Sequence, residues 1–219
     1  MRHDFESTPP PAEPKATMIE HHLDLASADG AMNTFVVQPE EGGPHPVVLF
    51  YMDAPGKREE LHDMARRIAA VGYVVVLPNL YYRRSRDFKL RERTEPAMAE
   101  MFEHMGSLDV STTLRDTAAL LAFVDAHPGA DARRIGAVGY CMSGPFVIWA
   151  AAAFPDRLRC IASIHGANMA TDGADSPHRM APRVKVRSGR RAAPGLPGRP
   201  WPRWTRCADR PRPIPDPWA

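Results

Sequence analysis

The chain contains the stretch Arg134-Ile135-Gly136-Ala137-Val138-Gly139-Tyr140-Cys141-Met142-Ser143-Gly144, a short apolar strand that runs into a cysteine flanked by small residues. This pattern is typical of a nucleophile elbow, where a strand turns abruptly into a helix. The turn requires small residues two positions before and after the nucleophile, and Gly139 and Ser143 stand there. The pattern predicts Cys141 at the N-terminus of a helix, where the helix dipole favours a thiolate.

The alternative interpretation of Cys141 is a buried core cysteine, which is where most free cysteines lie. A helical run from Pro145 to Phe154 follows the strand and the turn, and this context favours the nucleophile. Cys160 lies inside the apolar stretch Cys160 to Ile164, so we expect it to be an ordinary core cysteine.

Composition indicates one globular domain. The 219 residues are 44% hydrophobic and 25% charged, which suits an α/β domain with a substantial core. Three cysteines without framework spacing argue against disulfides and fit a reducing compartment. The N-terminus lacks an apolar leader, and no apolar run approaches a membrane span of about 18 residues. We therefore expect a cytoplasmic protein without a membrane partner, and, lacking a zinc pattern, without a metal or cofactor.

Charge is unevenly distributed along the chain. The formal net charge is +2, but residues 186 to 219 hold eight arginines and two aspartates, a charge of +6. Residues 1 to 185 therefore carry −4, and the body of the protein is mildly acidic.

The order of expected elements indicates a mostly parallel sheet covered by helices on both faces. After a proline-rich leader at 1–16, expected to be disordered, a hairpin joins Ile19–Leu25 to Ala31–Val37 through an Asp-Gly turn. Strands and helices then alternate. The strands are expected at 46–51, 73–77, 135–138 and 160–164, and the helices at 59–70, about 108–126, and 145–154.

Reaction sites on such sheets lie at the carboxyl ends of the parallel strands. Four segments meet this condition: Tyr51–Gly56, Pro78–Arg83, the Cys141 elbow, and His165–Asn168. We expect all four to converge on one rim of the sheet.

From Met18 to Lys185 the chain resembles the dienelactone hydrolase family, a branch of the α/β-hydrolases that uses a cysteine nucleophile. The resemblance rests on Gly139–Gly144, on Val71–Arg83 and on Tyr51–Asp53, each ahead of or within the expected rim loops. It implies an α/β-hydrolase fold and an activity toward carboxylic esters or lactones.

Carried over residue by residue, the resemblance makes Cys141 the nucleophile of a thioester acyl-enzyme. The backbone N–H groups of Met142 and Ala54 would form the oxyanion hole. The family places a glutamate near the first rim loop beside the resting cysteine, and the nearest acid here is Asp53, one methylene shorter. The alternative reading of Asp53 is a turn former ahead of Pro55 and Gly56.

The resemblance also implies substrate contacts. Arg83 matches a family arginine that binds the substrate carboxylate, with Tyr82 beside it, and the alternative is a solvated loop arginine. His165 follows the strand directly after the elbow, too early for the base in the triad order of nucleophile, acid and histidine. Packing or substrate contact therefore suits His165 better than proton transfer.

After Lys185 the alternation of strands and helices ends. The last 34 residues hold eight prolines, eight arginines and three of the four tryptophans, but no histidine, and predict a disordered tail. The family carries its triad aspartate and histidine on two further strands here, and neither is recognisable, because Asp209 and Asp216 stand among prolines. We interpret the change as a reading-frame shift; the alternative is a natural basic tail.

The sequence thus predicts an incomplete α/β-hydrolase domain at 17–185, truncated after the strand near 160–164, between disordered termini. The expected function is hydrolysis of a small-molecule ester or lactone through Cys141, impaired because the triad acid and histidine are missing. One alternative is a non-catalytic remnant. A weaker alternative is a protein that binds nucleic acid or an acidic partner through its basic tail. The oligomeric state is not predicted.

Overall fold

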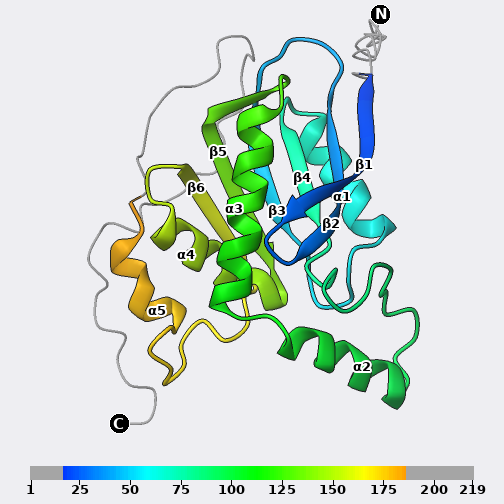
Figure 1. Cartoon of the computed structure of the whole chain (residues 1–219), viewed down its shortest axis with the longest axis vertical. Helices are drawn as coiled ribbons and strands as arrows, with labels where there is room; N and C mark the ends of the chain where they lie inside the picture. The colour runs from blue at the N-terminus through cyan, green and yellow to red at the C-terminus, as the bar shows by residue number, and fades with distance from the viewer. Residues whose placement is uncertain (1–16, 186–219) are drawn as a thin grey trace, which may run out of the picture. The chain divides into compact units, whose positions relative to one another are not determined.

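A computed structural model describes residues 17 to 185 (Figure 1). The expected leader at 1–16 and the expected tail at 186–219 lie outside the described residues. The described part of the chain contains six strands and five α-helices. In order they are β1 (Met18–Ser27), β2 (Gly30–Pro39), β3 (His45–Tyr51), α1 (Glu59–Ala69), β4 (Val74–Pro78), α2 (Glu95–Gly106), α3 (Val110–Ala126), β5 (Ala130–Tyr140), α4 (Gly144–Ala153), β6 (Leu158–Ile164) and α5 (Pro177–Met180).

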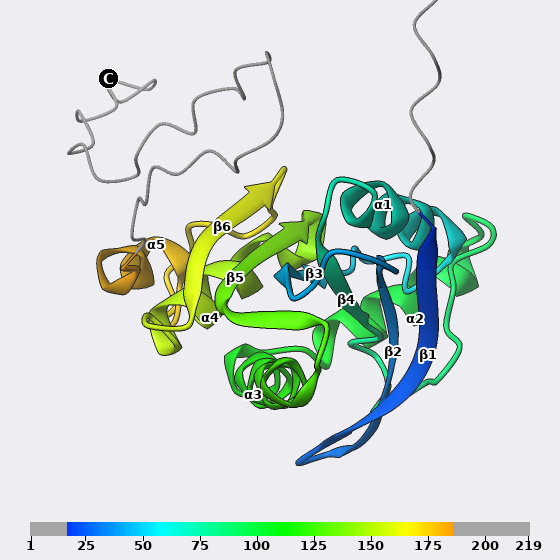
Figure 2. The ribbon, with the colours of Figure 1, turned by 90° about the horizontal axis from the view of Figure 1, so that it is seen from above.

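The strands form one mixed sheet in the order β1-β2-β4-β3-β5-β6. The hairpin β1-β2 is antiparallel and β2 joins β4 antiparallel, whereas β4, β3, β5 and β6 run parallel to one another. Figure 2 shows α1 on one face of the sheet and α3 and α4 on the other. The expectation of a mostly parallel sheet with helices on both faces is confirmed.

Strand register brings the rim loops together. Tyr51 at the end of β3 pairs with Gly139 in β5, and Tyr140 pairs with Ile164 at the end of β6. Because β4 runs parallel to β3, the loops after β3, β4, β5 and β6 leave the sheet on the same rim. The predicted convergence of four loops is therefore confirmed.

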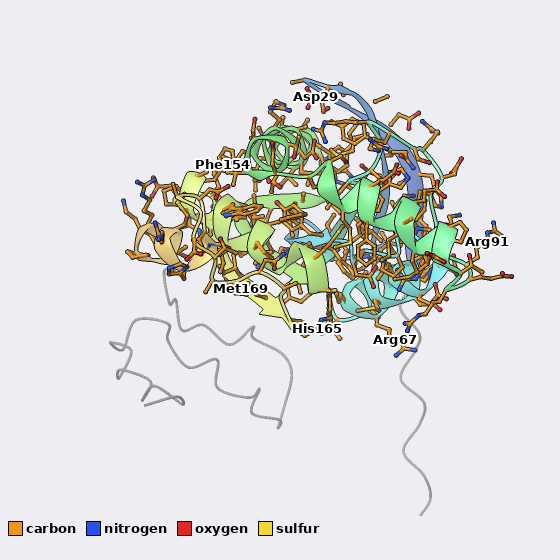
Figure 3. All side chains as sticks on the ribbon, turned by 90° about the horizontal axis from the view of Figure 1, so that it is seen from below. Asp29, Arg67, Arg91, Phe154, His165 and Met169 are labelled. Carbon is orange, nitrogen blue, oxygen red and sulfur yellow. The ribbon has the colours of Figure 1, made fainter. Side chains whose placement is uncertain are left out.

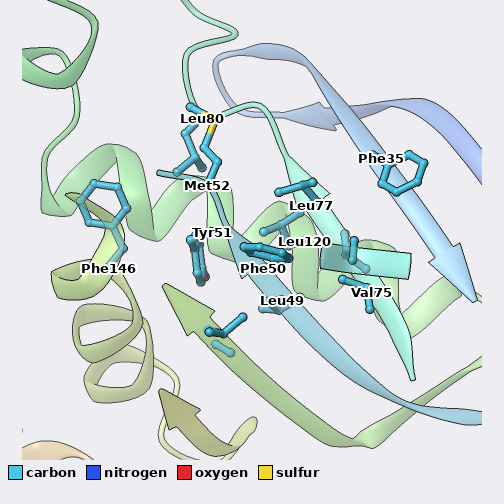
Figure 4. Packing of buried hydrophobic residues seen from close by; sticks show 14 of the residues in the cluster. Phe35, Leu49, Phe50, Tyr51, Met52, Val75, Leu77, Leu80, Leu120 and Phe146 are labelled. Atoms are coloured by element: carbon cyan, nitrogen blue, oxygen red, sulfur yellow. The ribbon is translucent and has the colours of Figure 1, made fainter. Parts of the chain in front are cut away.

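The core lies where the two central strands are buried on both faces. Every residue of β4 is buried, and side chains from β3 and the loop beyond it fill the space toward α3 and α4. Figure 4 shows this packing around Phe50, with Met52 and Leu80 meeting at the rim and Phe146 approaching from α4. A parallel strand that is covered by helices on both faces requires a continuous apolar run, such as the Val-Val-Val-Leu run of β4.

Two features differ from the expectations. Helix α2 was not predicted. It follows Thr94 and has Pro96 in its first turn, where a residue without an N–H is tolerated because the first N–H groups of a helix have no acceptor in the helix. The expected burial of Cys160 is wrong: its side chain is exposed, because β6 is the last strand of the sheet within residues 17 to 185. In that same part of the chain, the helices are too short or too polar to cross a membrane.

Candidate active site

The turn between β5 and α4 has the geometry of a nucleophile elbow. Cys141 adopts φ of +53°, a left-handed conformation that is rare and strained for a residue with a side chain. A single 3₁₀ turn over Cys141–Ser143 then leads into α4. The thiol is partly exposed at the helix N-terminus, as the sequence predicted for a nucleophile.

Small residues at the elbow are enforced by close backbone contacts. A Cβ on Gly139 would lie 2.2 Å from the carbonyl oxygen of Ser143 and 3.1 Å from Val147. A Cβ on Gly144 would lie 2.3 Å from the Cα of Gly166, in the loop after β6. These contacts leave no room for a side chain at Gly139 or Gly144, so both positions of the turn require glycine.

Ser143 also ties the elbow to the neighbouring strand. Its buried hydroxyl accepts a hydrogen bond from the Tyr140 N–H at 3.0 Å and donates to the carbonyl oxygen of Tyr51 at 2.9 Å. Ala167 donates its N–H to the carbonyl of Cys141 at 2.9 Å. The strained turn is therefore held from three sides, and a fully satisfied buried hydroxyl fixes its shape.

The two predicted oxyanion-hole residues lie beside one tyrosine. The hydroxyl of Tyr81 donates to the carbonyl of Ala54 at 2.9 Å and lies 3.1 Å from the sulfur of Met142. Ala54 donates its own N–H to no acceptor within residues 17 to 185. Met142 stands in the first turn after the strand, where backbone N–H groups have no acceptor inside the helix. Tyr81 thus brings the two residues close together, and the oxyanion hole formed by their N–H groups stays a prediction.

Sequence reasoning named the loop that carries Tyr81 but did not assign this residue a role. Tyr81 is fully buried and packs on Phe88 and on His104, whose ring centroid lies 5.0 Å away. Burial raises the pKa of its hydroxyl, and the nearby charges of Asp53 and Cys141 raise it further. The signal that could have identified Tyr81 is its position on a rim loop after a fully apolar strand.

Asp53 lies at the rim but is engaged by an arginine. Both carboxylate oxygens accept hydrogen bonds from Arg58, and the same guanidinium donates to the carbonyl of Gly56 at 3.0 Å. This bidentate pair raises the pKa of Arg58. The carbonyl of Asp53 also closes a turn with the N–H of Gly56 at 3.3 Å, so the turn-forming role is present.

Arg83 and Tyr82 belong to a second polar cluster. Arg83 donates to both oxygens of the buried Asp116 at 2.6 and 3.0 Å and to Asp29 at 2.7 Å. Tyr82 donates to Asp116 at 3.0 Å and also contacts Ser27. The structure therefore directs this predicted substrate-binding pair toward the β1-β2 hairpin and α3. Their predicted contact with a substrate carboxylate stays a prediction.

His165 stands at the end of β6 on the rim. It is exposed and has φ of +43°, and its ring centroid lies 6.1 Å from that of Tyr140, next to the nucleophile. Figure 3 shows His165 far from Asp29, which marks the Arg83 cluster. His165 is thus the predicted substrate-contact residue that shares the elbow's surroundings.

A cavity of about 260 Å³ opens beside Met142. Its walls come from the turn before α4 and the first two turns of α4, the end of α2 with the segment after it, and the stretch from Ala167 to Pro177. The lining residues are Met105, Leu108, Met142, Pro145, Phe146, Trp149, Ala167, Asn168, Thr171, Asp175, Ser176 and Pro177. Within residues 17 to 185, no cluster of three or more His, Cys, Asp or Glu side chains is arranged to hold a metal ion.

A mostly parallel sheet with helices on both faces and a strained residue at the strand-to-helix turn defines an α/β-hydrolase. A family model defines a narrower class than the α/β-hydrolase fold. Residues 32–187 match the Dienelactone hydrolase family, and the chain belongs to that family.

Curated relatives carry one recurring name, "Putative carboxymethylenebutenolidase". The protein of that name from Methylorubrum extorquens is 28% identical over 127 residues, which cover 58% of this chain and 42% of the relative. The one from Synechocystis is 25% identical over 137 residues, covering 62% and 54% respectively. The chain therefore spans about half the length of the curated relatives it matches.

Solved structures share the fold. A Klebsiella pneumoniae protein described as a "Putative Dienelactone Hydrolase" superimposes with a TM-score of 0.68 at 23% identity, covering 78% of this chain and 70% of the other. A dienelactone hydrolase from Anabaena variabilis gives a TM-score of 0.56 at 16% identity, covering 77% and 70%. At these identities the likeness concerns the fold.

Proposed function

We propose that this chain carries the nucleophile site of a carboxylic ester or lactone hydrolase, in which Cys141 accepts the acyl group of a small-molecule substrate. The observation that carries the proposal is the left-handed Cys141, partly exposed between the end of β5 and the N-terminus of α4. The family and the name of the curated relatives support an ester or lactone as the substrate class.

The chemistry follows from the position of the thiol. The positive end of the α4 dipole favours the thiolate of Cys141, which attacks the carbonyl carbon and forms a C–S bond. Negative charge develops on the carbonyl oxygen, where the N–H groups of Met142 and Ala54 would stabilise it. Tyr81, which contacts both residues, positions this pair of donors.

Collapse of the tetrahedral species completes acylation. The ester C–O bond breaks, the acyl group stays on sulfur as a thioester, and the leaving alkoxide takes a proton from water, which balances the proton that the thiol released to water. The exposure of His165 beside Tyr140 supports the proposal that it contacts the substrate at the rim. A substrate carboxylate could reach Arg83 only by displacing Asp116 or Asp29 from its guanidinium.

Asp53 has a supporting role in this proposal. Its carboxylate lies close enough to Tyr81 to affect the pKa of that hydroxyl, but both of its oxygens are bound to Arg58. We assign Asp53 to holding the Ala54 loop in place, and its contact with the resting thiol would require release from Arg58.

We infer that the described residues, 17 to 185, give Cys141 no positioned base for deacylation. The sequence holds no histidine after His178, and within residues 17 to 185 no histidine side chain is hydrogen-bonded to Cys141. A positioned general base accelerates such a step by about 10²–10⁴-fold. We therefore propose that the chain forms the thioester once and hydrolyses it far more slowly than it forms it.

The test is acylation by 4-nitrophenyl acetate, followed by intact-protein mass spectrometry and by nitrophenolate release. We expect one acetyl group per chain on Cys141 and a single burst of nitrophenolate without steady turnover. Cys141→Ala should abolish both. Cys160→Ala is the matched control, because it removes another exposed thiol in the same domain, and it should leave both unchanged.

Three outcomes would change the proposal. Equal acetylation of Cys141→Ala and the native chain would show that Cys141 is not the nucleophile. Absence of acetylation in the native chain would favour the non-catalytic remnant. Steady turnover that needs Cys141 would show that another group supplies the missing base.

A further inference from the structure

We propose that the site selects uncharged, apolar esters and discriminates against esters that carry a carboxylate. This inference rests on the proposed function, and it deepens it by naming the substrate class.

The first step is the position of the cavity. Met142, whose N–H is a proposed oxyanion donor, forms one wall, and Ala167, whose N–H binds the Cys141 carbonyl, forms another. Met142 borders both the elbow and the cavity, so a substrate whose carbonyl lies at Met142 has this space beside it for its neighbouring group. The cavity is therefore where the site distinguishes substrates.

The second step is the chemistry of the walls. Phe146 and Trp149 stack with ring centroids 5.4 Å apart and an interplanar angle of 20°, and Leu108 and Met105 also line the cavity. Aromatic faces of this kind bind flat apolar groups through burial and stacking. The indole N–H of Trp149 donates to the carbonyl of Asp175 at 2.8 Å, which holds the ring in place.

The third step is charge. Asp175 is the single charged side chain among the described lining residues, and it is negative. The nearest predicted carboxylate-binding group, Arg83, is bound to the buried Asp116 and to Asp29 and does not line the cavity. Among residues 17 to 185, a carboxylate in the cavity would lose solvation without gaining a cation, which is costly.

The experiment compares two acetate esters of similar shape, phenyl acetate and 4-carboxyphenyl acetate. Acetylation of Cys141 is followed by mass spectrometry, and each rate is divided by the rate of the same ester with free cysteine. We expect the native chain to prefer phenyl acetate by about tenfold, which corresponds to about 1.4 kcal/mol. Trp149→Ala should reduce this preference several-fold, and Asp175→Asn should raise the rate with the carboxylate ester.

Phe102→Ala is the matched control for Trp149→Ala, because Phe102 is an exposed aromatic residue on α2 that does not line the cavity. The Phe102→Ala variant should prefer phenyl acetate over 4-carboxyphenyl acetate by the same factor as the native chain. Equal normalised rates, or a preference for the carboxylate ester, would overturn the inference and leave the nucleophile intact. Absence of acetylation by both esters, with Cys141 still alkylated by iodoacetamide, would overturn the proposed function and this inference with it.

Discussion

At the scale of single residues, the backbone strain of the elbow lies at Cys141, and close backbone contacts hold that residue in its strained conformation. Cys141 holds a left-handed conformation because Ser143 anchors the turn to β3 and Ala167 anchors it to the loop after β6. Such strain persists only where the surroundings over-determine the backbone. The same contacts that present the thiol therefore make the turn intolerant of any added side chain.

Gly139→Ala tests this directly. Its Cβ would meet the carbonyl oxygen of Ser143 at 2.2 Å, so we expect a loss of about 3 kcal/mol in the free energy of unfolding, the upper end for overpacking. For a domain of this size that lowers Tm by about 8 °C. Acetylation of Cys141 should fall with it. Both are measured by thermal unfolding and by mass spectrometry.

Gly106→Ala is the control for this substitution. A Cβ on Gly106 meets nothing within 4 Å, and alanine is the better helix former, so Tm should stay the same or rise slightly. Equal stability of the two alanine variants would contradict the steric account of the elbow.

At the scale of elements, the sequence predicted the bounds of the helices and strands whose apolar pattern is continuous. The strands β3, β4 and β6 and the helices α1, α3 and α4 were predicted within two residues at either end, because buried apolar runs report strand and helix periods directly. β5 begins at Ala130, five residues earlier than expected, since Asp131, Arg133 and Arg134 interrupt its apolar pattern.

The candidate site was predictable only in part. The cysteine elbow follows from local sequence, whereas the partners of Arg83 do not. Asp29 and Asp116 are 54 and 33 residues away in the chain, and only the assembled fold brings them to the guanidinium. The contact of Tyr81 with Ala54 and Met142 is likewise a product of strand order.

The cap of α3 gives a prediction that depends on pH. Asp109 accepts a hydrogen bond from the Thr112 N–H at 2.7 Å, and this bond lowers the pKa of its carboxyl. Asp109→Ala should cost about 1 kcal/mol at pH 7. Because the folded pKa is depressed, the stabilisation is present above the unfolded pKa of about 3.9 and is lost as the pH falls through the folded value.

Urea unfolding at pH 7, 5 and 3 checks the prediction. The difference between the native chain and Asp109→Ala should shrink at pH 3. Asp109→Asn keeps a capping oxygen that does not titrate, so its advantage over alanine should persist at all three values. A native advantage that stays constant down to pH 3 would exclude the carboxylate as its source.

At the scale of the whole molecule, the two edges of the sheet differ in their protection. The outer strand β1 exposes Glu20, His21, His22 and Asp24, whereas β6 exposes Cys160 and Ser163 and carries one charge, Arg159. Within residues 17 to 185, no strand pairs with the outer side of β6. Unpaired edges with few charged side chains are templates for association between chains. We therefore expect concentration-dependent aggregation that begins at β6.

An added lysine tests whether aggregation begins at the β6 edge or depends on the net charge of the chain. Cys160→Lys places a charge on the exposed edge, and it should lower light scattering by the full-length chain at high concentration and raise its soluble yield. Val71→Lys makes the same gain in charge at an apolar side chain that is 58% exposed and lies away from β6, between α1 and β4. Scattering should fall clearly only for the β6 variant. If the two variants behave alike, net charge governs solubility and the edge does not, because both add one positive charge to the chain.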